Sequence, residues 1–354
     1  MKNKFLNRLS IKDQVHFAKR LAFLVRAGVP IVESLKIIRK QTKSKIKGRI
    51  MQKVVDDVSS GQFLASSLAK FKHTFGDFAI NIIRVGESSG ILEQNLVYLS
   101  DELKKKQALR QKVVAAFIYP IFITIATVGL TVLLTIFIFP KIRPIFDSMH
   151  VVLPLSTKIL IFVSDFLLAY WAYFFGSIFL CIALFFVAYQ KFEPLRFFLD
   201  RQSLRVPLVG KIIQNYGMAN ISRTLGLLLK SGIRVIEAID ITAETTGNLV
   251  YKKELHHIAK EVFKGEKISK YFEKRPDLFP DIFSQMVAIG ERTGNLPETL
   301  IYLSELHESD VEDLTKNLSS SIEPVLMLFM GFMVGFVAVS VITPIYEITQ
   351  NLKR

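Results

Sequence analysis

Two short glycine-bounded segments carry the residue types that come closest to a chemical site. They are residues 86–90 (Gly-Glu-Ser-Ser-Gly) and residues 290–294 (Gly-Glu-Arg-Thr-Gly). A carboxylate at an exposed corner could contact a partner protein or hold a hard cation. The same residues also fit a helix–turn–helix in which the last glycine is left-handed and a Ser or Thr caps a helix end. The pattern leaves both roles open, and the candidates for partner contact are Gly86, Glu87, Gly90, Gly290, Glu291 and Gly294.

The sequence carries no recognisable catalytic, nucleotide or metal motif. It has no G-x-x-x-x-G-K-[ST] loop, no G-x-G-x-x-G and no H-E-x-x-H. His256 and His257 are adjacent, so on a helix they point about 100° apart and make a poor metal pair. Cys181 is the single cysteine, which excludes a disulfide framework and a thiolate cluster. We therefore expect no enzymatic activity, no catalytic residue, no cofactor, no metal and no small-molecule substrate.

Three long apolar segments predict membrane-spanning helices. The chain has 354 residues, 50% of them hydrophobic, and its mean hydropathy is +0.34. Residues 113–139, 159–189 and 322–346 each satisfy the length that a span requires. Buried helices of a soluble protein are the alternative, but three such segments in one chain favour spans.

The distribution of Lys and Arg predicts the orientation of these spans. Residues 1–112 hold 23 basic and 9 acidic residues, which places them on the cytoplasmic side. Residues 140–158 then form an extracytoplasmic loop, and residues 190–321 return to the cytoplasm. The short tail, residues 347–354, lies outside.

An internal repeat organises the chain. A shift of 204 residues, here called the repeat shift, places Gly86 on Gly290 and Pro120 on Pro324. Over residues 86–100 and their counterparts, eight of fifteen residues are identical. Each repeat is a helical domain followed by a span, with residues 159–189 as an additional element between them. Repeat 2 begins at about residue 215.

Each repeat is predicted to be all α. In repeat 1 the punctuation by glycine and proline predicts helices at residues 11–27, 31–42, 46–59, 64–71 and 76–87. A sixth helix begins after Gly90 and has no breaker before the membrane, so it can continue into the first span. The expected fold is an all-α membrane protein with two homologous cytoplasmic six-helix bundles and three transmembrane helices.

Prolines occupy equivalent places in the spans of both repeats. A proline inside a helix frees a backbone carbonyl and bends the helix, so these positions could be hinges or simply kinks that fit the bundle. Glu323 would be costly facing lipid and is expected to face protein or headgroups. The hinge candidates are Tyr119, Pro120, Pro140, Glu323, Pro324 and Pro344.

Three segments together resemble one known family. They are residues 112–120 (Lys-Val-Val-Ala-Ala-Phe-Ile-Tyr-Pro) with Pro140, the paired Gly-Glu corners, and residues 153–157 (Leu-Pro-Leu-Ser-Thr). They are similar to the type II secretion F-domain family, the inner-membrane platform proteins of type II secretion systems and type IV pili. The resemblance extends from about residue 12 to 349.

The resemblance implies a function and a set of partners. It implies a multi-pass protein of the bacterial cytoplasmic (inner) membrane, with a cytoplasmic N-terminus, that forms a dimer or larger homo-oligomer. Its partners would be a hexameric cytoplasmic assembly ATPase, pilins or pseudopilins, other inner-membrane assembly proteins and membrane lipid. It would couple the ATPase to insertion and extraction of pilin subunits. Secretion, pilus assembly and a competence pseudopilus for DNA uptake all remain open as the system served.

Two other classes of protein share some of these features. A small membrane transporter can also have duplicated halves, but transporters place polar sites at mid-bilayer, whereas the duplicated mass here is mostly soluble. A nucleic-acid-binding membrane protein would use the basic residues 1–112. Much of that charge adjoins the first span, where anionic lipid and the positive-inside rule account for it.

Overall fold

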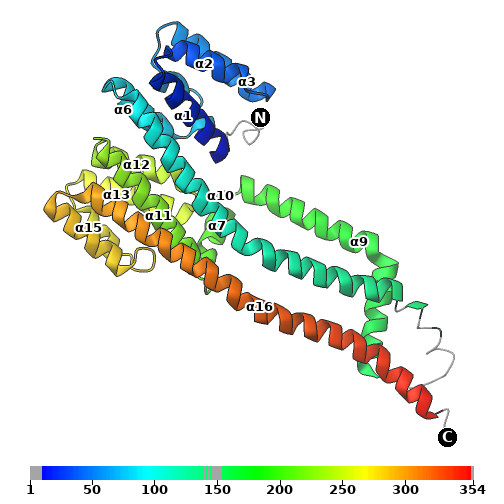
Figure 1. Cartoon of the computed structure of the whole chain (residues 1–354). Coiled ribbons are helices and arrows are strands. Elements are labelled where there is room, and N and C mark those ends of the chain that lie inside the picture. The colour runs from blue at the N-terminus through cyan, green and yellow to red at the C-terminus, as the bar shows by residue number, and fades with distance from the viewer. Residues whose placement is uncertain (1–9, 139, 142–143, 145–153, 352–354) are drawn as a thin grey trace. The chain divides into compact units, whose positions relative to one another are not determined.

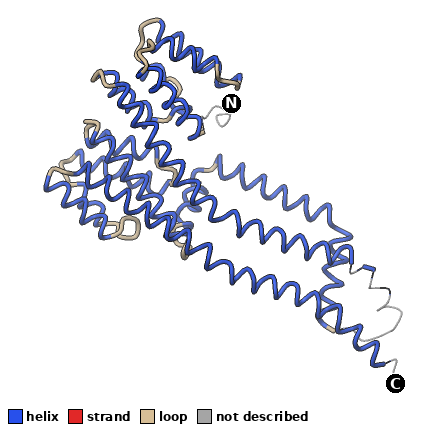
Figure 2. The backbone as a smooth tube through the Cα atoms, in the orientation of Figure 1, coloured by secondary structure: helices blue, strands red, loops and turns tan. Residues whose placement is uncertain are grey.

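A computed structural model of the chain describes residues 10–138, 140–141, 144 and 154–351. Within these ranges every residue lies in a helix, a loop or a turn, and none lies in a strand (Figure 2). The chain divides into two compact units. The first, here called the bundle unit, holds residues up to 113 and residues 199–313, and the second, the apolar unit, holds residues 114–198 and those from 314.

Repeat 1 supplies the first half of the bundle unit. All the helices predicted there are present, and a four-residue helix, α5, is added between the fourth and fifth. Figure 1 labels α1, α2, α3, α6 and α7 of this repeat. The elements are α1 (Ile11–Arg26), α2 (Ile31–Lys40), α3 (Lys45–Ser59), α4 (Leu64–Ala69), α5 (Lys72–Phe75), α6 (Asp77–Ser88) and α7 (Leu92–Leu133).

Repeat 2 has matching helices. They are α11 (Val209–Lys230), α12 (Val235–Thr245), α13 (Leu249–Phe263), α14 (Ile268–Glu273), α15 (Asp281–Thr293) and α16 (Leu296–Asn351), preceded by α10 (Glu193–Ser203). The bounds of α3 and α13, and of α4 and α14, correspond at both ends under the repeat shift. The duplication read from the sequence is therefore also a duplication of structure.

Local sequence explains where these helices begin and what they bury. Ser10 and Asp13 form a capping box at the start of α1, in which each side chain bonds the backbone of the other. The buried face of α1 includes Leu21, and the ring of Phe17 lies 5.3 Å from the ring of Phe75. Helix α6 of repeat 1 packs against α11 and α12 of repeat 2, so the two repeats share one folded body.

The apolar unit contains the membrane-crossing segments. Two helices are long and apolar enough to cross a membrane, Leu92–Phe137 and Leu296–Thr343, and a third candidate is a pair bent by 100°, Gly176–Tyr189 with Glu193–Ser203. In the candidate span Leu92–Phe137, helix α7 passes into a short π-helix, η1 (Leu134–Ile138). The chain is a membrane protein with two such helices among the described residues, and the third span stays a prediction.

Helix α9 (Leu155–Lys191) is held to its neighbours in the apolar unit by hydroxyl groups. Thr157 Oγ1 donates to the carbonyl of Ser340 in α16 at 2.7 Å, and Ser164 Oγ donates to the carbonyl of Thr135 in η1 at 2.9 Å. Such interhelical hydrogen bonds are a common way to join helices where water is excluded. Helix α9 begins within the segment predicted as a loop (140–158), most of which lies outside the described residues.

The last helix of each repeat continues without a break past the proline of its span. Helix α7 includes Pro120 and α16 includes Pro324, so the predicted continuation of the sixth helix into the first span is confirmed.

Candidate functional site

The glutamate of the first Gly-Glu corner caps another helix. Glu87, near the end of α6, is half-buried, and its two carboxylate oxygens accept hydrogen bonds from the backbone N–H groups of Leu64 (2.6 Å) and Ala65 (2.7 Å). These two groups open α4, whose N-cap residue, Phe63, offers no side-chain acceptor. A charged acceptor at this end also complements the helix dipole.

The second corner repeats this arrangement. Glu291 accepts hydrogen bonds from the N–H groups of Ile268 (2.8 Å) and Ser269 (3.1 Å), which open α14. The N-cap residue there, Lys267, again provides no side-chain cap. The acid that both repeats share thus has a structural role that the sequence pattern did not reveal, because the start of the capped helix lies more than 20 residues upstream.

The flanking glycines serve the same corner in two ways. A Cβ on Gly86 would lie 3.0 Å from the Cα of Leu92, and one on Gly290 would lie 3.1 Å from the Cα of Leu296, so each glycine lets two helices approach closely. Gly90 and Gly294 both have φ of 71°, the left-handed conformation expected at a helix end. The structural interpretation of the corners is supported, and a partner contact at them stays a prediction.

The hinge candidates lie on the two long helices. Tyr119 is exposed, and the carbonyl of Pro120 accepts a hydrogen bond from Thr124 Oγ1 at 2.8 Å. Glu323 and Pro324 are exposed on α16, which also includes Pro344, and Pro140 is helical. Hinge motion at these positions stays a prediction.

The structure reveals one buried charged cluster that the sequence did not predict. Arg223 of α11 lies between two carboxylates, 2.9 Å from Glu102 of α7 and 2.6 Å from Glu308 of α16. The side chains of Arg223, Glu102 and Glu308 are 7%, 8% and 21% exposed. Three helices from both repeats therefore meet at a single guanidinium group, and we call these three residues the charged joint.

Burial governs the electrostatics of the charged joint. Burial raises the pKa of Glu308, while the positive charges of Arg223 and Lys105 act to lower it. Burial also raises the pKa of Tyr98, whose hydroxyl lies in the same region. Lys105 adds a second cation, 3.4 Å from Glu102. The joint can hold the three helices together by paired charge.

An apolar layer lies beside the charged joint. Leu109 of α7, Ala219 of α11 and Val311 of α16 form one buried cluster, against which Val113 and Tyr216 pack. Lys112 and Glu312 form an ion pair across the same two helices, α7 and α16. Helices α7 and α16 are thus in contact with each other just before the residues at which each of them passes into the apolar unit.

Sequence reasoning missed the charged joint because it is absent from repeat 1. The counterpart of Arg223 is Lys19, which is exposed, and the counterpart of Glu308 is Lys104, also exposed. The one available signal was this difference in charge between positions that the repeat shift makes equivalent.

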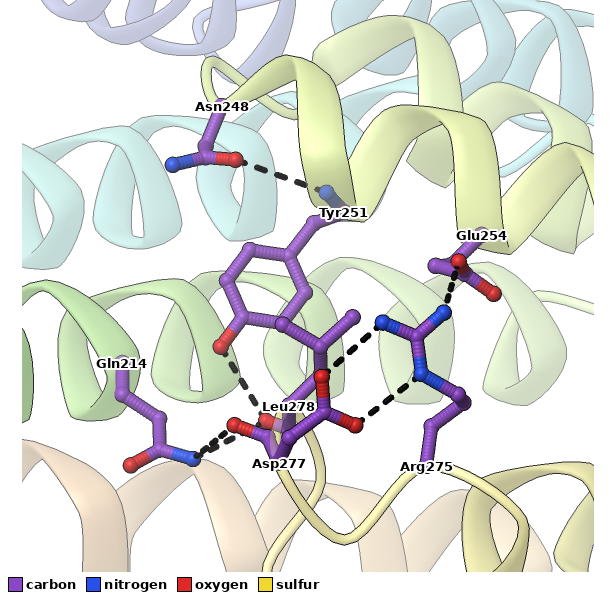
Figure 3. Close-up of polar contacts among 7 residues, drawn as sticks. All are labelled: Gln214, Asn248, Tyr251, Glu254, Arg275, Asp277 and Leu278. Carbon is purple, nitrogen blue, oxygen red and sulfur yellow. Dashed lines mark hydrogen bonds and ion pairs between the residues drawn. The ribbon is translucent and has the colours of Figure 1, made fainter. Parts of the chain in front are cut away.

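A second polar cluster fixes the loop between α14 and α15 in repeat 2 (Figure 3). Tyr251 Oη donates to the carbonyl of Leu278 at 3.1 Å, and Gln214 Nε2 donates to the same carbonyl at 3.2 Å. Arg275 bonds both carboxylate oxygens of Asp277 at 2.9 Å and lowers the pKa of that carboxyl group. Glu254 is the second acidic partner of Arg275.

No group of three or more His, Cys, Asp or Glu residues in the described part of the chain could hold a metal ion. The contacts described above hold helices in place: two carboxylates cap helices, two glycines allow close helix packing, and one buried guanidinium group joins three helices.

Comparison with known proteins assigns the family. The family described as "Type II secretion system (T2SS), protein F" matches the chain twice, at residues 17–140 and 221–344. The chain belongs to this family. The two matches are related by the repeat shift, so they confirm both the resemblance and the duplication, and they end at Pro140 and Pro344, two of the hinge candidates.

Relatives of this chain carry two kinds of name. It is 33% identical over 345 residues to the Type IV pilus assembly protein PilC of Thermus thermophilus, covering 97% of this chain and 84% of that protein. It is 29% identical over 336 residues to the protein PilC of Pseudomonas aeruginosa (95% and 90% coverage). It is 30% identical over 346 residues to the Type II secretion system protein F of the same bacterium (98% and 85% coverage).

Proposed function

We propose that this protein is the inner-membrane platform of a type IV pilus or type II secretion machine. In this role it relays motion from a cytoplasmic assembly ATPase to pilin or pseudopilin subunits in the membrane. It performs no catalysis of its own. The observation that carries the proposal is the uninterrupted course of α7 and α16, each of which begins in the bundle unit and ends in the apolar unit.

The charged joint supports this role. Because Arg223 pairs with both Glu102 and Glu308, the last helices of the two repeats are tied to one residue of α11. A displacement of either repeat would therefore be passed to both long helices together. The two cytoplasmic helical bundles would supply the surface for the ATPase, and three spans would supply the surface for pilins.

An insertion at the boundary between the units tests the relay. Gly-Ser-Gly-Ser placed between Val113 and Val114 would interrupt α7 with flexible residues, whereas four alanines at the same place would keep it helical. We expect the flexible insertion to abolish surface pili or secretion in complemented deletion cells while the chain stays abundant in the membrane. The alanine insertion should retain more activity. Full assembly with the flexible insertion would contradict the relay.

The deletion itself tests the system served. Loss of the chain should remove surface pili, the secreted proteins of a type II system, or DNA uptake, and the phenotype that the intact chain restores identifies the machine. ATP hydrolysis by the purified chain alone would contradict a passive role.

Cysteine labelling tests the topology. In a Cys181→Ser background, an impermeant reagent should label a cysteine at Ser148 but not one at the exposed positions Ser59 or Lys260, if residues 1–112 and 190–321 are cytoplasmic. Label at Ser59 in intact cells would overturn the assignment.

Self-association and the corners need their own tests. Light scattering of the detergent-solubilised chain should detect a dimer or larger assembly, and a monomer in several mild detergents would argue against one.

If the corners contact the ATPase, Glu87→Lys with Glu291→Lys should stop assembly while the chain stays folded. If they only cap helices, the same change should lower the melting temperature and abundance.

A further inference from the structure

Repeat 1 contains a pocket. Its volume is ≈ 340 Å³, within the range of small ligand sites, and it is lined by α1, α2, α3, α5 and the loop between α2 and α3. The apolar floor includes Phe17 and Phe75, and exposed basic residues, among them Arg20 and Lys43, stand at its rim.

The corresponding space in repeat 2 is filled by the side chain of Tyr251. Its ring lies 5.8 Å from the ring of Phe279, it would contact a Cβ on Gly217 at 3.2 Å, and its hydroxyl donates to the carbonyl of Leu278 (Figure 3). The repeat shift places these three neighbours on Phe75, Asp13 and Thr74. All three counterparts line the pocket of repeat 1.

Repeat 1 has no aromatic side chain at the position equivalent to Tyr251. Lys47 stands at the position of Tyr251, and its Nζ lies 2.5 Å from Asp13 Oδ2. Burial acts to raise the pKa of Asp13, but hydrogen bonds from Lys47 and Ser10 lower it overall, so this carboxylate stays charged and neutralised by its lysine.

The rim of the pocket carries more positive charge than the equivalent positions of repeat 2. Arg20 and Lys43 line the pocket, whereas their counterparts in repeat 2 are Thr224 and Gly247. With Asp13 already paired, Arg20 and Lys43 add charge that an acidic ligand would complement. The pocket thus combines the walls of an aromatic site with a cationic entrance.

We infer that this pocket binds an aromatic side chain, flanked by Asp or Glu, from a partner protein. The Tyr251 site in the second repeat shows how such a ring is held, and the basic rim selects its neighbours by charge. Residues 1–9 of the chain are poor candidates for the occupant, since they carry Lys2, Lys4 and Arg8 and no acid. The inference needs neither an ATPase nor a pilin and so stands apart from the proposed function.

A short peptide provides the probe. Fluorescein-labelled Glu-Asp-Tyr-Asp-Glu should bind the purified full chain in detergent with saturable fluorescence anisotropy. Replacing its Tyr by Ala should weaken binding by about tenfold, because the buried ring is lost. Raising the salt from about 0.05 M to about 0.5 M should also weaken binding, since exposed charges are screened over that range.

Two double variants place residues of repeat 2 at the equivalent positions of repeat 1. Asp13→Gly with Lys47→Tyr should fill the pocket and weaken binding by about tenfold or more. Arg20→Thr with Lys43→Gly should remove rim charge without touching the floor, which keeps the test valid if the first variant does not fold. A matched control, Lys36→Thr with Lys53→Thr, changes two exposed lysines outside the pocket and should leave affinity unchanged.

Three results would overturn the inference: no saturable binding to the full chain, equal binding of the alanine peptide, or unchanged affinity in the rim variant. Displacement of the peptide by guanosine monophosphate, together with equal binding of the alanine peptide, would assign the pocket to a nucleotide instead.

Discussion

At the Gly-Glu corner, repeat 1 and repeat 2 are interchangeable in structure. Glu87 and Glu291 each cap a short helix through two backbone N–H groups, and the adjacent glycines serve the same contacts in both. At the charged joint the repeats differ completely, because Arg223 is buried between carboxylates while its counterpart Lys19 is exposed. The same contrast separates the filled Tyr251 site from the open pocket of repeat 1.

This difference separates two demands on a duplicated chain. Residues whose role is to satisfy the backbone of their own repeat have stayed alike, because every copy of the fold has the same unpaired N–H groups. Residues that join one repeat to the other differ between the repeats, because the two copies have different neighbours. The same holds for residues proposed to face a partner. Four changes can test whether this separation holds.

Removal of Arg223 should have the largest effect. Arg223→Ala would leave Glu102 and Glu308 buried without their cation, which costs about 3–5 kcal/mol. Lys19→Ala at the equivalent exposed position should change stability by about 0.5 kcal/mol or less. Denaturant unfolding of the full chain in detergent would measure both, and equal losses would abolish the contrast.

Changes to the capping glutamates should be intermediate and equal. Glu87→Gln and Glu291→Gln each keep one carbonyl acceptor but turn the other oxygen into a donor that faces a backbone N–H. We expect each to cost about 1–3 kcal/mol. Hydrogen exchange at the first residues of α4 and α14 would locate the damage. A large loss in one repeat and none in the other would show that the corners are not equivalent.

The Tyr251 hydroxyl should matter less. Tyr251→Phe keeps the ring and removes one hydrogen bond, at a cost of about 0.5–1.5 kcal/mol, and the Leu278 carbonyl still accepts from Gln214. Lys47→Met in repeat 1 removes a partly exposed ion pair and should cost about 1 kcal/mol or less. Thermal unfolding can rank the two variants, and a greater loss for Lys47→Met would reverse the comparison.

The smallest expected effect is a pH dependence confined to repeat 2. His307 is buried, and burial lowers its pKa below the ordinary 6.5 even though Asp310 acts to raise it. The unfolded chain therefore binds more protons than the native chain, so stability should fall as pH falls through about 6.5. His307→Leu, which restores the residue of repeat 1 (Leu103), should flatten the melting temperature between about pH 5 and pH 7. An unchanged slope would exclude His307 as the cause.

The sequence predicted those parts of the fold that depend on local pattern. Glycine, proline and apolar periodicity located the helices of repeat 1 to within a few residues, and the left-handed Gly90 followed from its place after a helix. The continuation of α7 into the membrane followed from the absence of a helix breaker. The short helix α5 was missed, because four residues carry too little periodicity to be recognised.

The sequence could not predict contacts between distant segments. Glu87 lies 23 residues from the N–H of Leu64, and Glu102 lies 121 residues from Arg223. Neither partner can be identified from spacing or composition alone. The pocket was hidden for the same reason, since its walls come from four helices and a loop that only the fold brings together.

The separation of Glu102 and Arg223 in the chain has a consequence for biogenesis. Repeat 1 can close its own corner as soon as residues 64–87 have left the ribosome, because every group in that cap is local. Glu102 must wait for Arg223, which is translated only after α9 and the whole of the first span. Until then its nearby cation is Lys105, three residues along the same helix. The order of translation therefore makes the union of the two repeats a late event, and a chain arrested before residue 223 would carry a finished corner but a Glu102 without Arg223.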